Sequence, residues 1–259
     1  MRHHEAVIFH RYVALGDSFT EGVGDPDPAR PNGLRGWADR VAEALADQTG
    51  DFGYANLAIR GRKLRPILAE QLEPAVALDP DLVTIHAGAN DVLRPSVDLD
   101  DLAAAYDTAI GRLSTTGARV VMFTAFDPGR AGIYRALRGR MAIFNELVRE
   151  IADRHQADIV DMWRMRDVDV AEVMDTDRMH LNPAGHQAIA MEVLDTLGIE
   201  HTLEPEEVAP RPVLGRREQL AENARWARDF LGPWIHRRLT GRSSGDGVPP
   251  KRPRLEPVR

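Results

Sequence analysis

Short apolar runs alternate with longer segments of helical periodicity along most of the chain, and this alternation constrains the fold more than any other feature. Such a pattern is typical of a parallel β-sheet that is covered by helices on both faces. We therefore predict an α/β fold with a five-stranded sheet. The predicted strands are Arg11 to Leu15, Tyr54 to Ala58, Leu82 to His86, Arg119 to Thr124, and Asp158 to Asp161.

The segments between these strands predict the helices that cover the sheet. They are Trp37 to Gln48, Leu64 to Leu72, Leu99 to Ser114, and Ile133 to His155. A further helix is expected from Pro183 to about Leu197, because Asn182 can cap its first turn and proline is tolerated there. Ligands of such folds bind at the carboxyl ends of the strands, so residues directly after strands become the candidates for function.

The chain divides by composition into three parts. Residues 1–200 are predicted to form the main domain, which holds the predicted sheet, and residues 201–240 a linker followed by an amphipathic helix. In that helix Trp226, Phe230 and Trp234 form an aromatic row, which we expect to pack on the domain, although it could instead cap the cleft or dock a partner or lipid surface. Residues 241–259 are rich in glycine, serine, proline and arginine and are predicted to be disordered.

Composition also excludes several classes of function. The net charge of −7 argues against a general nucleic-acid binder, and the absence of cysteine removes disulfides, thiolate metal sites and cysteine nucleophiles. No apolar run is long enough to span a bilayer, and the first apolar run is too short for a signal peptide. We therefore expect a cytoplasmic protein without stable membrane insertion.

Four short segments carry residues that are suited to acyl transfer. Ser18 directly follows the first strand, and Asp177 and His180 are spaced so that the carboxylate can orient the imidazole in one turn. Gly61 and Asn90 follow the second and third strands, where a backbone amide and a side-chain amide could stabilise a negative oxygen. Each segment alone is also compatible with an ordinary turn or helix start.

In combination, the four segments resemble the blocks of the SGNH hydrolase family, also called GDSL lipases and esterases. The matching blocks are ALGDSFTEG, NLAIRG, GAND and DRMH, in the order of the family, within about residues 11 to 197. Phe19 stands where the family often has leucine. The resemblance implies a flavodoxin-like three-layer α/β/α sandwich and a catalytic triad of Ser18, His180 and Asp177 without metal or cofactor.

The resemblance also implies an oxyanion hole built from Ser18, Gly61 and Asn90, and structural roles for Asp17 and Asp91, which would tie loops together. It predicts a serine esterase that acts on a small-molecule ester. A thioesterase, a lysophospholipase and a carbohydrate acetylesterase are alternatives within the family, and a binding or scaffolding module on the same fold is an alternative of another class. Substrate-binding residues and oligomeric state are not predicted.

Other polar residues near these blocks have simpler explanations. His86 and His186 lack a carboxylate at the spacing of His180 and are expected to serve packing or a helix face. A basic group around Gly61 could attract an anionic substrate, but a solvated helix start is favoured; it consists of Arg60, Arg62, Lys63 and Arg65. The KRPR run in the tail is interpreted as a solubilising patch of a flexible terminus.

Overall fold

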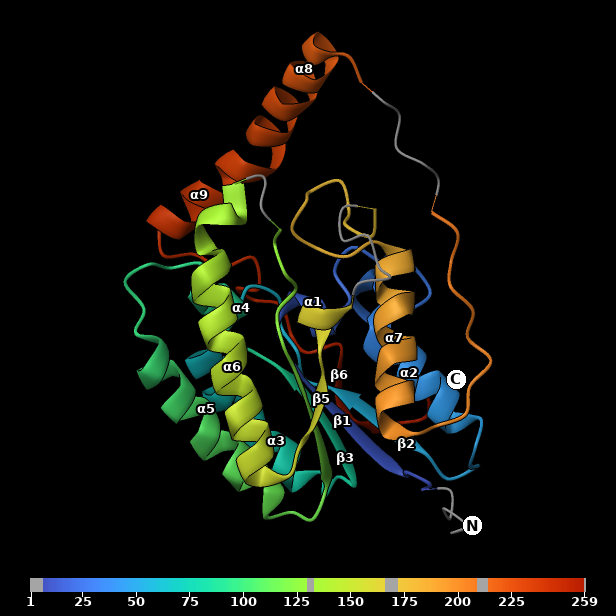
Figure 1. Ribbon diagram of the computed structural model, residues 1–259. Coiled ribbons are helices and arrows are strands. Elements are labelled where there is room, and N and C mark those ends of the chain that lie inside the picture. Colours follow the sequence, from blue (N-terminus) through green and yellow to red (C-terminus); the bar gives the residue numbers. More distant parts are fainter. Residues whose placement is uncertain (1–6, 130–132, 166–171, 209–213, 259) are drawn as a thin grey trace.

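The computed structural model describes residues 7–129, 133–165, 172–208 and 214–258, and its centre is a six-stranded β-sheet (Figure 1). The strand order is β5-β4-β3-β1-β2-β6. Strands β1 to β5 are parallel, and β6 pairs antiparallel with β2. The strands are β1 Arg11–Gly16, β2 Gly53–Asn56, β3 Leu82–His86, β4 Arg119–Phe123, β5 Asp158–Val160 and β6 Arg252–Glu256.

Helices cover both faces of the sheet and form two separate apolar cores with it. Alternate residues of β1 point to opposite faces, so that Tyr12 belongs to one core and Val13 to the other. The first face is covered by α2 Gly36–Ala46 and α7 Pro183–Leu197, and the second by α3 Leu64–Ala77, α5 Leu99–Ser114 and α6 Arg138–His155 (Figure 1). This arrangement confirms the predicted three-layer α/β/α sandwich.

The sixth strand corrects two predictions, because it comes from the tail that was expected to be disordered and it raises the strand count from five. Arg252 of β6 pairs with Asn56 of β2, and its guanidinium lies 5.7 Å from the ring centre of Tyr54. Val258 is buried in the first core. Although the tail has few apolar residues, the backbone ladder to the β2 edge orders it. Pro253 is tolerated because β6 is an edge strand.

The KRPR run is likewise part of the folded protein and not a solvated patch. The Lys251 ammonium is buried and lies 3.0 Å from a carboxylate oxygen of Asp39, which is also buried. It donates a hydrogen bond to the carbonyl of Arg35 at 2.6 Å. Buried charges require such pairing, so Lys251 fixes the tail against α2.

Two helices precede this tail and project from the sandwich. They are α8 Arg216–Trp226 and α9 Gly232–Leu239, joined by a π-helical turn at Ala227–Leu231 (Figure 1). Short helices α1 Ser18–Glu21 and α4 Ala89–Val92 follow β1 and β3, and single 3-10 turns lie at Pro31–Gly33, Ile133–Leu137 and Met162–Arg164. Residues 209–213 of the predicted linker lie outside the described residues.

Candidate active site

Ser18 is the first residue of α1 and stands at the carboxyl end of β1, beside the point where the strand order reverses between β1 and β3. Gly16 makes this turn possible. Its φ is 151°, and an added Cβ would lie 2.5 Å from the hydroxyl of Thr20 and 2.7 Å from the carbonyl oxygen of His86. A larger residue therefore cannot stand in this turn, which carries Ser18 to the edge where ligands bind in such folds.

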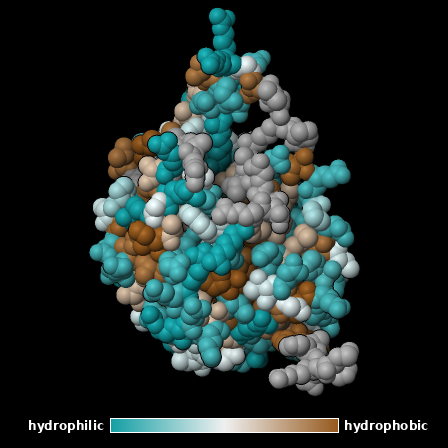
Figure 2. All heavy atoms as spheres, viewed as in Figure 1, coloured by the Kyte–Doolittle hydropathy of each residue, from teal (hydrophilic) through white to brown (hydrophobic). Residues whose placement is uncertain are grey.

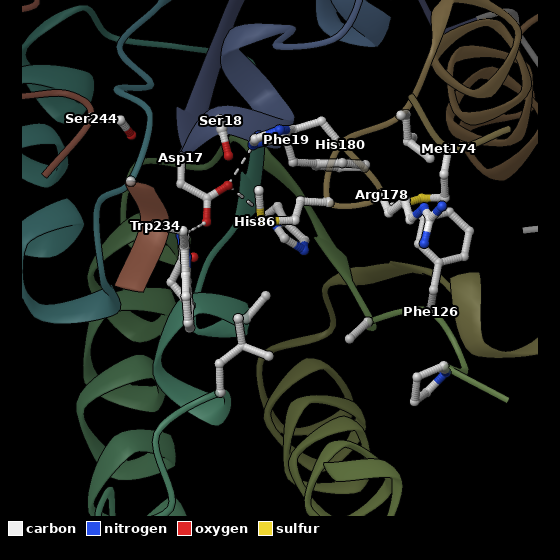
Figure 3. Close-up of a pocket in the computed structure, with 18 of the residues that line it drawn as sticks. Asp17, Ser18, Phe19, His86, Phe126, Met174, Arg178, His180, Trp234 and Ser244 are labelled. Carbon is white, nitrogen blue, oxygen red and sulfur yellow. Dashed lines mark hydrogen bonds and ion pairs between the residues drawn. The ribbon is translucent and has the colours of Figure 1, made fainter. Parts of the chain in front are cut away.

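The carboxylate of Asp17 ties three segments of the site together. It caps α1 by accepting a hydrogen bond from the Phe19 amide at 3.1 Å, and it accepts a second from Nδ2 of Asn90 at 2.8 Å. Nδ1 of His86 lies 3.7 Å away (Figure 3). Asp91 links two further segments, because its carboxylate in α4 accepts a hydrogen bond from the Leu64 amide at the start of α3. The predicted structural roles of both aspartates are confirmed.

Asp177 and His180 form a close pair in the loop before α7. Nδ1 of His180 lies 2.5 Å from Oδ2 of Asp177, and Oδ1 accepts hydrogen bonds from the backbone amides of Met179 and His180 at 2.8 and 3.0 Å. Burial raises the pKa of Asp177, but the hydrogen bond from His180 and those backbone amides outweigh it and lower the pKa. The carboxylate therefore stays ionised and orients the imidazole.

A pocket of about 360 Å³ brings together the side chains that the four blocks predicted. Ser18, Gly61, Asn90 and His180 all line it, and Asp177 lies behind His180. Much of the remaining lining is apolar. Among the described residues, the large apolar side chains of the lining are Phe19, Leu93, Phe126, Met141, Met162, Met174, Met179, Leu181 and Trp234. The structure thus places every predicted site residue at one site.

The donors predicted for an oxyanion hole differ in their present hydrogen bonding. Within the described part of the chain, the backbone amides of Ser18 and Gly61 donate no hydrogen bond. Nδ2 of Asn90, in contrast, donates to Asp17 and, at 3.1 Å, to the carbonyl of Arg62. Two amides are ready to bind an anion, whereas the third would have to exchange a partner.

Gly61 also permits a close approach by the C-terminal part of the chain. Its φ is 73°, and an added Cβ would lie 2.5 Å from the hydroxyl of Ser243 and 2.8 Å from that of Ser244. Ser244 itself lines the pocket. The tail therefore crosses directly over one of the predicted oxyanion residues.

Three residues of the C-terminal part that the sequence did not assign to the site also line the pocket. They are Trp234, Arg237 and Ser244. In Figure 3, Trp234 and Ser244 lie on the side opposite Met174 and Phe126. The aromatic row had suggested a cap over the cleft as one alternative, and Trp234 takes such a position, while Nε1 of Trp226 donates to the carbonyl of Asp177 at 2.8 Å. No motif signalled Arg237 or the methionines.

The histidines and arginines set aside in the sequence have protein partners. His186 is fully buried under α2, which confirms its packing role, and His86 is buried at the base of the pocket beside Phe19. Arg60 pairs with the buried Glu21 at 2.6 Å, and Arg62 pairs with Glu70 at 2.9 Å. These two arginines are therefore neutralised and do not form an open anion site.

Membrane-spanning helices and metal centres are two other kinds of functional element that a chain can carry. None of the helices among the described residues combines the length and apolar character that a bilayer crossing requires. No group of three or more histidine, aspartate or glutamate side chains is arranged there to hold a metal ion.

The surface view shows polar side chains mixed with scattered apolar ones over the visible face (Figure 2).

Comparisons with known proteins agree with this geometry. The model of the GDSL-like lipase/acylhydrolase family matches residues 14–188. An arylesterase of Vibrio mimicus is 26% identical over 183 residues, which are 70% of this chain and 84% of the relative. LAE5, an alpha/beta hydrolase enzyme from the metagenome of Lake Arreo, superposes with a TM-score of 0.63 at 25% identity over 76% of this chain and 99% of its own.

An acetyl xylan esterase of Geobacillus stearothermophilus shares the fold, with a TM-score of 0.60 at 23% identity over 74% of this chain and 96% of its own. In both structural comparisons the neighbour is matched almost completely, whereas about a quarter of this chain has no counterpart. The family match ends at residue 188, before the C-terminal part that reaches the pocket.

Proposed function

Because the chain belongs to the GDSL-like lipase/acylhydrolase family of ester-hydrolysing enzymes, we propose that it cleaves carboxylic esters through an acyl-enzyme at Ser18. One observation supports this most directly. The imidazole of His180 is held at 2.5 Å by Asp177 and lines the same pocket as Ser18. A nucleophile, a base and a group that orients the base are the three parts that such a reaction requires.

The hydrogen bond between His180 and Asp177 determines the direction of proton transfer. Nδ1–H donates to the carboxylate, which leaves Nε2 as the acceptor for the proton of Ser18. Ser18 Oγ then attacks the ester carbonyl, and the imidazolium returns the proton to the leaving alcohol. In the second half of the reaction, a water gives a proton to His180 while its oxygen attacks the acyl carbon. The bond from this carbon to Ser18 Oγ then breaks, the acid leaves, and the imidazolium returns its proton to Oγ.

The negative oxygen of the tetrahedral intermediate would bind to the backbone amides of Ser18 and Gly61 and to the amide of Asn90. The first two are free to donate within the described residues. Asn90 would redirect one hydrogen from Asp17 or from the Arg62 carbonyl. Donors aimed at that oxygen lower the barrier because they act only where charge develops.

The lining of the pocket favours esters with an apolar acyl or aryl group. Met141, Met162, Met174 and Phe126 surround the space next to the catalytic residues and present few hydrogen-bonding groups. An acetylated sugar needs polar partners for its hydroxyls, because a buried hydroxyl without a partner costs free energy. The carbohydrate acetylesterase is therefore the alternative that this pocket fits least.

Replacing the nucleophile tests the proposal. Ser18→Ala should lower kcat for 4-nitrophenyl butyrate by about 10⁴-fold or more, because no other group then attacks the ester. A fluorophosphonate should label the wild-type protein at Ser18, as mass spectrometry of peptides would show. Ser114→Ala is the matched control, because Ser114 bonds to its own helix at the Ile110 carbonyl. Wild-type turnover in the Ser18→Ala protein would disprove the assignment.

The oxyanion role of Asn90 has its own test. Asn90→Ala should lower kcat by about 100-fold with little change in KM, because the lost hydrogen bond is made mainly in the transition state. Circular dichroism and the melting temperature would show whether the loop that Asn90 ties to Asp17 stays folded. An unchanged kcat would remove Asn90 from the oxyanion hole and leave it a structural residue.

A further inference from the structure

The C-terminal extension, which we define as residues 214–258, is anchored on both sides of the active site. Trp226 bonds to the carbonyl of Asp177 in the catalytic loop. Farther along the chain, Ser243 and Ser244 lie against Gly61, and β6 joins the sheet at β2. The extension is therefore a fixed wall of the pocket and not a loosely attached tail.

This wall contributes a charge to a pocket that is otherwise mostly apolar. Among the described residues that line the pocket, three carry a charged side chain, namely Asp17, Arg178 and Arg237. Asp17 is engaged by Asn90 and the Phe19 amide. The three side chains differ in whether other residues of the protein already form hydrogen bonds or ion pairs with them.

Arg178 has its partners within the extension. Its guanidinium donates to Glu222 at 3.0 Å and to Asn223 at 2.8 Å, and it lies 5.2 Å from the ring centre of Trp226. A guanidinium that is paired with a carboxylate and stacked on an indole has little remaining attraction for a substrate anion. Arg178 serves to join the catalytic loop to α8.

Arg237, in contrast, has no such partner in the part of the chain that the structure describes. It is half-buried on α9, and within the described residues its guanidinium makes no hydrogen bond or ion pair. A partly desolvated cation among apolar side chains is costly unless an anion pairs with it, and a planar guanidinium binds carboxylate and phosphate oxygens in a bidentate manner. No carboxylate of the described residues pairs with it, so the guanidinium can take an anion that is bound in the pocket.

We propose that Arg237 is a specificity residue that pairs with an anionic group of the substrate, so that the enzyme prefers esters carrying a carboxylate or a phosphate. This inference rests on the proposed esterase function and adds the charge of the substrate to it. The apolar side of the pocket holds the hydrocarbon part, and α9 holds the anion. The family match ends before Arg237, so this preference belongs to the extension of this chain.

Two pairs of esters test the proposal, and the members of each pair differ in one charged group. In the first pair, 4-nitrophenyl hemisuccinate carries a carboxylate where 4-nitrophenyl 4-methylpentanoate carries an isopropyl group of similar shape. In the second, 1-butyrylglycerol 3-phosphate is compared with 1-butyrylglycerol. The first pair places a carboxylate on the acyl side and the second a phosphate on the alcohol side, so the two sources of the anion are distinguished.

The wild-type enzyme should favour the anionic member of at least one pair by about tenfold in kcat/KM, since a hydrogen-bonded charge pair contributes at least this much when partly buried. Arg237→Gln should abolish that preference while the neutral ester keeps its rate within about twofold, which also shows that the variant is folded. Arg242→Gln is the matched control, because Arg242 is exposed and does not line the pocket.

The outcomes separate the two hypotheses. Hydrolysis of the neutral esters with no charge preference in either pair, or with a preference that survives Arg237→Gln, would overturn the role of Arg237 and leave the esterase function intact. Failure of the wild-type enzyme to hydrolyse any of the four esters would overturn both. A preference that also shrinks in 0.5 M NaCl would support the ion pair, because salt screens a partly exposed charge.

Discussion

Two histidines close to the start of α7 have opposite environments. The side chain of His180 is 25% exposed, and its Nδ1 is held by the carboxylate of Asp177. His186 is fully buried, its Nδ1 accepts from the Trp37 amide, and its Nε2–H donates to the carbonyl of Val23, both at 3.2 Å. In the proposed mechanism, Nε2 of His180 is left to act on Ser18, whereas the backbone occupies both ring nitrogens of His186.

The difference extends to protonation. Burial lowers the pKa of His186 to about 4, so this ring is neutral at physiological pH and stays neutral in mild acid. Its surroundings contain the buried ion pair of Arg40 and Asp25, which is part of the same polar cluster beneath α2. A carboxylate on one ring nitrogen makes a general base, while two backbone partners and full burial make a structural residue.

The largest effect that separates the two rings is on catalysis. His180→Gln should lower kcat by about 10⁴-fold or more, because glutamine cannot take the proton of Ser18. His186→Gln should leave kcat within about threefold, because an amide can both accept from Trp37 and donate to Val23. Steady-state kinetics on one neutral ester would measure both. Equal losses in the two variants would refute the division of roles.

A smaller effect should appear in acid stability. Since the folded state resists protonation of His186 and the unfolded state does not, the unfolded state binds more protons between pH 6.5 and about 4. The free energy of unfolding should therefore fall by about 3 kcal/mol as the pH is lowered through that window. Urea titrations at a series of pH values would measure it.

The same titrations on His186→Gln should give a flatter curve between pH 6.5 and 4, because the glutamine does not titrate. Asp177 does not confuse the comparison. Its pKa is lowered in the folded protein, so its contribution is present above the unfolded value of 3.8 and is lost only below it. A slope that is unchanged in the variant would show that another group controls acid stability.

The sequence predicted the five parallel strands and the grouping of the candidate site residues around one pocket, because both depend on local patterns. Apolar runs predict β1 and β3, and short blocks predict Ser18 directly after β1 and His180 in the loop before α7. The predictions failed where stability comes from distant partners. Composition could not show that Lys251 pairs with Asp39, or that the β2 edge would order β6.

The contribution of the C-terminal extension to the pocket could not be predicted from the sequence for a related reason. Arg237 lies in a helix whose charged residues look like any solvated face, and only its position over the pocket distinguishes it. The aromatic row that contains Trp234 predicted only that these side chains are buried. Aromatic residues at helical spacing do not indicate which surface they pack against. A contact between segments that are far apart in the sequence, such as α9 and the pocket, leaves no pattern in either segment alone.

The pairing of β6 with β2 also has a consequence for how the protein is made. Most of the chain is synthesised after β2 and before β6. During translation the β2 edge therefore stays unpaired, and Asp39 lacks Lys251 as its partner. Contacts between such distant segments form slowly, and an unpaired strand edge invites association with other chains. We therefore expect the wall that carries Arg237 to be completed late in folding, with the nascent chain most prone to aggregate before its last strand docks.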